Sequence, residues 1–225
     1  FDKAFAAQYE RKIRASIPGY EALHAMARDL MHGACPARAH ILCVGAGTGM
    51  EIVTLGRSEP GWRFTAVDTS AEMGAICERN LAAAGMSDRV TIHVGGLSGL
   101  PAGEPFQAAT SLLVAHFLPT AEERTEHFRA LAARLEPRGL LVAAELLGDR
   151  DQEHFTRFFA AWKRHYIANG IDPAEADQDF ARTERVVKFL AEATYERILA
   201  AAGFAEAWMF YRALLFSGWI ARRRN

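Results

Sequence analysis

Residues 40–51 read His-Ile-Leu-Cys-Val-Gly-Ala-Gly-Thr-Gly-Met-Glu, and this stretch decides the fold. An apolar run over 41–44 stops at glycines on every second position, and a second apolar stretch follows from 50 to 55. The glycines are Gly45, Gly47 and Gly49, with Ala46 between the first two. The pattern predicts a buried strand that turns sharply into a helix, because glycine lets backbone approach a ligand where a Cβ would collide.

A second apolar run, over 62–67, ends on Asp68, about twenty residues beyond the glycines. A carboxylate in that place can accept hydrogen bonds from both hydroxyls of a ribose. Dinucleotide-binding proteins use the spacing G-x-G-x-x-G, in which the third glycine lets helix and strand pack closely. Here that position is Met50, and the additional glycine falls one residue earlier. The spacing therefore argues against a dinucleotide site, while a glycine turn without any ligand stays an alternative.

A strand, the spacing G-x-G-x-G and an acid at the end of the next strand resemble class I S-adenosylmethionine (SAM) methyltransferases. The resemblance implies SAM as cofactor and S-adenosylhomocysteine as product. It also implies that the glycine turn, residues 45–49, holds the cofactor.

Composition narrows the class of protein further. The chain has 225 residues, with 26 basic and 27 acidic side chains, which suits one domain without the cationic field of a nucleic-acid-binding protein. Three cysteines without C-x-x-C spacing indicate neither a disulfide framework nor a metal site. No apolar run reaches membrane-spanning length, and we expect a cytoplasmic protein with a small-molecule substrate. A homodimer is left open.

Strand and helix patterns alternate from residue 41 onwards, which predicts a parallel sheet with helices on both faces. Two apolar-rich segments close the chain, too near each other for a crossover helix, so they must pair antiparallel. The expected fold is α/β: a Rossmann-like seven-stranded sheet, parallel with an antiparallel C-terminal hairpin. Its strands are expected at 41–44, 62–67, 90–94, 108–114, 140–146, 206–211 and 213–221.

Helix signals divide the single domain 1–225 more finely. Residues 1–37 are expected to form an N-terminal helical cap, interrupted by a turn at 16–20. The patterns T-x-x-E at 69–72 and 120–123 predict capping boxes, and Gly139 is expected to end the second of these helices. Residues 149–190 break the alternation and carry an aromatic stripe at helical spacing. We expect it to be either plain core or a helical lid whose inner face lines a substrate pocket.

The segments Ser-Ile-Pro-Gly-Tyr at 16–20 and Trp-Met-Phe-Tyr-Arg-Ala-Leu-Leu-Phe-Ser-Gly-Trp at 208–219 resemble a narrower group. This group includes carboxy-SAM synthase and many bacterial small-molecule methyltransferases. The resemblance implies that Tyr20 contacts the amino-acid part of the cofactor and that Asp68 and Thr69 bind the ribose. It implies further cofactor contacts at Gly45, at Gly96, Leu97 and Met73 near the adenine, and at Ser111 after the fourth strand.

Two positions depart from the group. Gly96 stands where the group commonly has the acid that receives the adenine amino group. Phe180 stands where the synthase uses an arginine to hold the additional carboxylate of its product, with Arg182 and Arg185 nearby. A buried carboxylate without a cationic partner is costly, on the order of several kcal/mol. Ordinary SAM is therefore preferred, with a carboxy-SAM synthase acting on SAM and prephenate, or a non-catalytic nucleotide-binding module, as alternatives.

Methyl transfer from a sulfonium is an in-line displacement that needs alignment and sometimes a base. His116, just after the fourth strand, is the candidate catalytic base. Glu145, late in the fifth strand, and His154 and His165 in the inserted segment are further candidates. Proximity alone is the alternative. The sequence thus predicts a SAM-dependent methyltransferase acting on a small molecule, with no metal.

Overall fold

Seven strands form one twisted sheet in the order β3-β2-β1-β4-β5-β7-β6, in a computed structural model that describes residues 3–225 and the side chains from residue 8 onwards. The first five strands are parallel, and β7 runs antiparallel to both of its neighbours. The Rossmann-like sheet with an antiparallel C-terminal hairpin is thereby confirmed. The strands are β1 (His40–Val44), β2 (Arg63–Asp68), β3 (Val90–Val94), β4 (Phe106–Leu112), β5 (Leu135–Leu146), β6 (Phe204–Ala213) and β7 (Phe216–Arg223).

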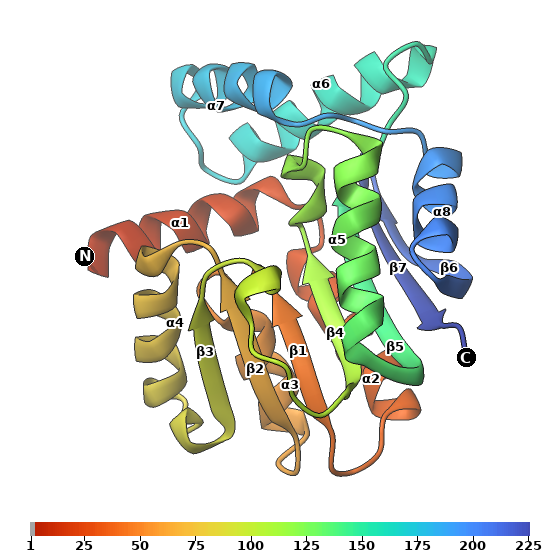
Figure 1. Cartoon of the computed structure of the whole chain (residues 1–225). Coiled ribbons are helices and arrows are strands. Elements are labelled where there is room, and N and C mark those ends of the chain that lie inside the picture. The colour runs from red at the N-terminus through yellow and green to blue at the C-terminus, as the bar shows by residue number, and fades with distance from the viewer. Residues whose placement is uncertain (1–2) are drawn as a thin grey trace.

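Helices cover both faces of this sheet (Figure 1). Successive side chains of a strand point to opposite faces, so Ile41 and Cys43 of β1 pack into one core cluster and Leu42 and Val44 into the other. The longer helices are α1 (Lys3–Ser16), α2 (Tyr20–Ala34), α3 (Met50–Ser58), α4 (Ala71–Ala83), α5 (Ala121–Arg134), α6 (Glu153–Ala168), α7 (Pro173–Val186) and α8 (Glu192–Ala201). Short 3₁₀ turns are η1 (Ser87–Arg89), η2 (Leu97–Gly99) and η3 (Ala115–Phe117).

The strand order reverses between β1 and β4, because the chain first adds β2 and β3 on one side and then β4 and β5 on the other. Connections leave in opposite directions at such a point, which opens a crevice outside the carboxyl ends of the strands. The glycine turn follows β1 directly and therefore lies at the edge of this crevice.

The predicted strand boundaries need two corrections near the centre of the sheet. β4 ends at Leu112 and not at 114, because Leu113 adopts a left-handed backbone conformation with φ 63°. Helix α5 ends at Arg134 rather than at Gly139, and β5 begins at once. Pro137 explains the early end, since proline lacks an N–H and drives the residue before it to an extended conformation.

The two predicted capping boxes have different outcomes. The box at Thr120 and Glu123 is confirmed, with the threonine hydroxyl accepting from the Glu123 N–H. The one at 69–72 is wrong, because Ser70 caps α4 instead and accepts from the Met73 N–H at 3.2 Å. Asp68 takes the Ser70 N–H for its own carboxylate, which moves the helix start one residue along the chain.

The carboxyl ends of the parallel strands are covered by α1, α6 and α7 (Figure 1). Trp162 of α6 donates its indole N–H to the Ser16 carbonyl at the end of α1, at 2.7 Å. Lys12 of α1 forms an ion pair with Asp179 of α7 at 2.8 Å. The aromatic stripe of α6 is part of the core, with Phe155, Trp162 and Tyr166 buried. Within residues 3–225, none of the helices has the length and apolar character needed to cross a membrane.

Candidate active site

The glycine turn holds three residues in left-handed backbone conformations, with φ 69° at Gly45, 52° at Gly47 and 80° at Gly49. The Gly45 N–H is tied to the Val67 carbonyl of β2 at 2.7 Å. A Cβ at Gly45 would lie 2.2 Å from Val114 Cγ2, and one at Gly49 would lie 2.7 Å from Cys77 Sγ. A Cβ at Gly47 would meet nothing closer than 3.9 Å, so only its conformation requires glycine.

Asp68 points its carboxylate at this turn. One oxygen accepts from the Gly47 N–H at 2.8 Å and the other from the Ser70 N–H at 2.9 Å. Each oxygen keeps capacity for a further donor, since a carboxylate offers about four lone-pair sites. Tyr9 of α1 faces the same place: its pKa is raised first by burial and then by the charge of Asp68. The acid at the end of β2 is thus fixed beside the glycine turn, where a ribose could bridge it.

A cavity of about 300 Å³ opens between the glycine turn and the helices above it. Its wall includes Gly45, Ala46 and Gly47 of the turn, with Tyr20 from α2 and His116 from η3. The rest of the wall is mostly apolar. It comes from α1, α6, β5 and β7 and from the residues just after α1 and α7, through Ile13, Trp162, Leu146, Phe216, Ile17 and Val187.

Other residues that the sequence pointed to lie outside this wall. Thr69 and Gly96 are exposed, Met73 is half-buried at the start of α4, and Leu97 is buried against the core beneath α5. The Gly95 N–H donates to the Asp68 carbonyl at 2.8 Å, which ties the end of β3 to the end of β2. Thr69 and Gly96 follow the ends of the paired strands β2 and β3 and so lie near Asp68, whereas Leu97 lines a different cavity.

Ser111 lies away from the cavity wall. Its side chain is fully buried, and its hydroxyl is hydrogen-bonded to His127 Nε2 of α5 at 3.0 Å. Its neighbour Leu112 lines the cavity instead. Because side chains alternate along a strand, an alignment that is off by one residue places a side chain on the wrong face.

His116 and Glu145 form a buried pair at the cavity. His116 Nδ1 lies 3.5 Å from Glu145 Oε2, and the side chains are 4% and 0% exposed. Arg124 faces the same carboxylate and donates to the His116 carbonyl at 3.1 Å. Arg124 also donates to the Lys188 carbonyl beyond α7, which joins the loop that carries His116 to the end of the inserted segment.

Sequence reasoning missed three titratable residues of the cavity wall, Tyr9, His24 and Glu51. His24 packs edge-on against Tyr20 with ring centroids 4.4 Å apart, and burial lowers the pKa of His24 to about 4. Glu51 accepts from the Thr110 hydroxyl at 2.9 Å, and burial raises its pKa to about 7. The sequence does not show that the helices with Tyr9 and His24 fold over the crevice. Helical spacing alone could therefore not place these two residues in the site.

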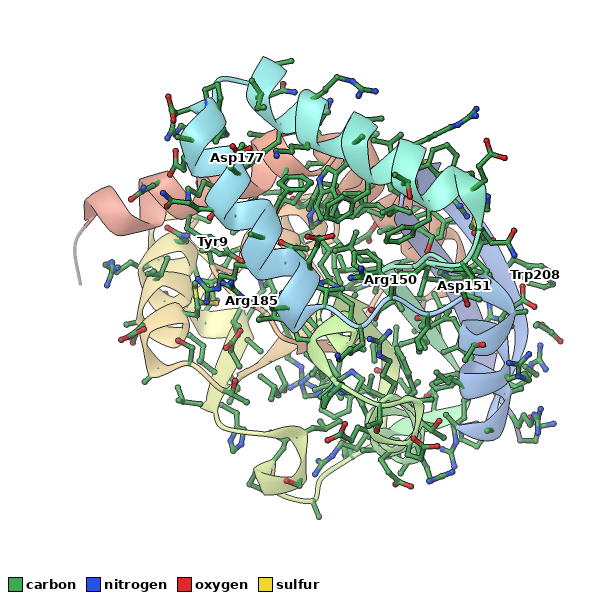
Figure 2. The ribbon with its side chains drawn as sticks, turned by 90° about the horizontal axis from the view of Figure 1, so that it is seen from above. Tyr9, Arg150, Asp151, Asp177, Arg185 and Trp208 are labelled. Carbon is green, nitrogen blue, oxygen red and sulfur yellow. The ribbon has the colours of Figure 1, made fainter. Side chains whose placement is uncertain are left out.

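The cavity wall contains no lysine or arginine side chain among residues 8–225. Phe180 is buried against Trp162, with ring centroids 4.6 Å apart. Arg182 and Arg185 are exposed, and Arg185 lies near the end of α7 (Figure 2). The described part of the chain also shows no cluster of metal-ligating side chains. This cavity therefore offers neutral and acidic groups but no cation.

Comparison with known proteins agrees with this geometry. Residues 41–139, from β1 into β5, match a family model described as a methyltransferase domain. This match covers less than half of the chain, and together with the sheet order and the glycine turn it supports a SAM-dependent methyltransferase, an enzyme that uses SAM as cofactor.

The individual relatives share only low sequence identity with this chain. The chain is 25% identical to the carboxy-S-adenosyl-L-methionine synthase of Shewanella woodyi over 226 residues, covering 98% of this chain and 91% of the relative. The crystal structure of human N-acetylserotonin methyltransferase in complex with SAM aligns with TM-score 0.59 at 14% identity, over 84% and 48% of the two chains. An O-methyltransferase family 2 protein of Planctomyces limnophilus in complex with apigenin aligns with TM-score 0.64 at 16% identity, over 99% and 62%. Both structural likenesses show the fold.

Proposed function

We propose that the cavity is the place where the SAM methyl group meets a small-molecule acceptor. In this proposal Asp68 binds the ribose, the glycine turn carries the rest of the cofactor, and the adenine lies near Gly96. The observation that supports it is the carboxylate of Asp68 fixed 2.8 Å from the N–H of Gly47, a residue that itself lines the cavity. A homodimer stays the possibility that the sequence left open.

His116 is proposed as the base that removes a proton from the acceptor during transfer. Its ring lines the cavity, and its Nδ1 faces Glu145, which leaves Nε2 as the nitrogen for the acceptor. The Glu145 carboxylate lies 3.5 Å from Nδ1 without a hydrogen bond to it, and its charge would stabilise the positive charge that the ring gains. Alignment of the acceptor with the methyl group supplies the remaining acceleration.

The inserted segment 149–190 is proposed as a lid over this site. Trp162 of α6 and Val187 just after α7 line the cavity, and Phe155 of α6 and Phe180 of α7 are buried in the core. Seen from above, α6 and α7 cross the strand ends, with Tyr9 on one side and Trp208 far away at the outer edge (Figure 2). Some residues of the segment therefore line the cavity, and others hold the segment in place by packing into the core.

The absence of a cation in the described wall favours ordinary SAM over carboxy-SAM. Carboxy-SAM carries one carboxylate more than SAM and prephenate carries two, and burying each additional one without a cationic partner costs on the order of several kcal/mol. The relatives named as carboxy-SAM synthases nevertheless make that reaction the alternative to test. We expect no product with the mass of carboxy-SAM when the protein is incubated with SAM and prephenate; its appearance would replace the methyl-transfer proposal.

Asp68→Ala should weaken SAM binding about 10- to 150-fold, because hydrogen bonds to a charged group contribute roughly 1.5–3 kcal/mol. Isothermal titration calorimetry with S-adenosylhomocysteine measures this, and thermal unfolding reports whether the variant folds. Asp88→Ala, at an exposed turn before β3, is the matched control and should bind normally. Unchanged affinity in Asp68→Ala would remove the ribose assignment.

A further inference from the structure

Glu51 is a buried acid in the cavity wall without a basic partner. Only 6% of the residue is exposed, and Oε1 accepts from the Thr110 hydroxyl at 2.9 Å. Burial is the largest cause of its raised pKa, and no basic side chain of the described residues offsets it. Buried carboxylates in proteins are paired or protonated as a rule, because desolvation of an isolated charge is expensive. A cationic ligand would supply the missing partner.

The position of Glu51 relative to Asp68 indicates which end of the cofactor it meets. Asp68 ends β2, whereas Glu51 is bonded to Thr110 of β4, and β1 with its glycine turn lies between them. A linear molecule whose ribose rests on Asp68 therefore reaches Glu51 only with its far end. Tyr20 lines the cavity on the same side, and the charge of Glu51 contributes to the raised pKa of that phenol.

We propose that Glu51 binds the ammonium group of the amino-acid end of SAM. The cofactor carries two positive centres, a sulfonium and an ammonium. A sulfonium has no proton to donate, whereas an ammonium offers three N–H donors to a carboxylate and a hydroxyl. Glu51, with Thr110 behind it, fits the ammonium. This assignment rests on the proposed placement of the cofactor and adds the residue that selects its amino-acid end.

The surroundings of Glu51 make this binding sensitive to pH. The groups that face it are Thr110 of β4, the Cys43 thiol of β1, the Cys77 thiol of α4 and the Tyr20 phenol of α2. Burial raises the pKa of both thiols and of the phenol, so all three stay neutral near pH 7. Of these groups, only Glu51 changes charge in that range. Below about pH 7 it is protonated in the empty protein, and an ammonium ligand must displace that proton.

The test compares three ligands on wild type and Glu51→Gln by isothermal titration calorimetry at pH 8. S-adenosylhomocysteine has the ammonium without the sulfonium, SAM has both, and 5′-methylthioadenosine has neither. We expect Glu51→Gln to weaken SAM and S-adenosylhomocysteine about 10- to 100-fold and to leave 5′-methylthioadenosine unchanged. A loss confined to SAM would assign Glu51 to the sulfonium and overturn the proposal, as would equal binding of all three by both proteins.

Two further measurements keep the outcome interpretable. Glu59→Gln changes a buried acid at the other end of α3, where it pairs with His32, and should bind all three ligands as wild type does. If Glu51→Gln does not fold, the pH dependence of ligand binding to the wild-type protein tests the proposal. Its affinity for S-adenosylhomocysteine should fall by up to about tenfold per pH unit below pH 7, while that for 5′-methylthioadenosine stays level. Parallel pH dependence for the two ligands would overturn the proposal, whereas failure of 5′-methylthioadenosine to bind at all would instead reject the ribose site at Asp68.

Discussion

His116→Asn should lower kcat for methyl transfer by about 100- to 10,000-fold, the usual contribution of a positioned general base. Asparagine keeps a polar side chain of smaller size but cannot accept a proton at neutral pH. Calorimetry with S-adenosylhomocysteine should show cofactor affinity within about twofold of wild type, because the glycine turn and Asp68 are untouched. Initial rates with the acceptor, once it is found, measure the loss.

Glu145 acts through His116 in this scheme, so its replacement tests orientation rather than proton transfer. Glu145→Gln should reduce kcat more than it changes the acceptor KM, since the ring of His116 still lines the cavity. His116→Gly should be partly rescued by added imidazole, which a purely structural histidine would not allow. A kcat unchanged in His116→Asn would show that the enzyme works by proximity alone.

The sequence specified the cofactor end of the site because that end is built locally. Gly45, Gly47 and Gly49 form one turn, and Asp68 follows the neighbouring strand, so spacing alone brings them together. Parallel pairing of β1 with β2 then fixes the register, with Val44 beside Val67. This register places Asp68 beside the glycine turn.

The acceptor end was less accessible because its wall comes from α1, α6, α7 and the last strand, far apart in sequence. Glu51 reads as an ordinary polar residue in the first turn of α3, and only the approach of Thr110 from β4 shows that it is buried. Ser111 is the opposite case, a residue that the sequence assigned to the site and whose side chain lies away from the cavity. Its side chain lies on the core side of β4 against His127, whereas that of its neighbour Leu112 lines the cavity, and no property of serine itself opposes either place.

Gly45→Ala should nearly abolish cofactor binding and destabilise the protein by about 2–5 kcal/mol. A left-handed backbone costs a residue with a Cβ roughly 1–2 kcal/mol, and forcing a group into a packed site adds about 1–3 kcal/mol. The new Cβ would lie 2.2 Å from Val114 Cγ2 and 3.0 Å from Val114 Cγ1, so the turn or the segment after β4 must shift. Urea unfolding and calorimetry with S-adenosylhomocysteine measure the two effects.

Gly85→Ala separates conformation from crowding, because Gly85 has nearly the same φ, 68°, and nothing within 4 Å of an added Cβ. It should cost only the conformational part, about 1–2 kcal/mol, and bind the cofactor normally. Adding Val114→Ala to Gly45→Ala removes both methyl groups in the way and should return part of the affinity. If the double variant binds no better than Gly45→Ala, the backbone conformation of the turn and not the space beside it controls access to the site.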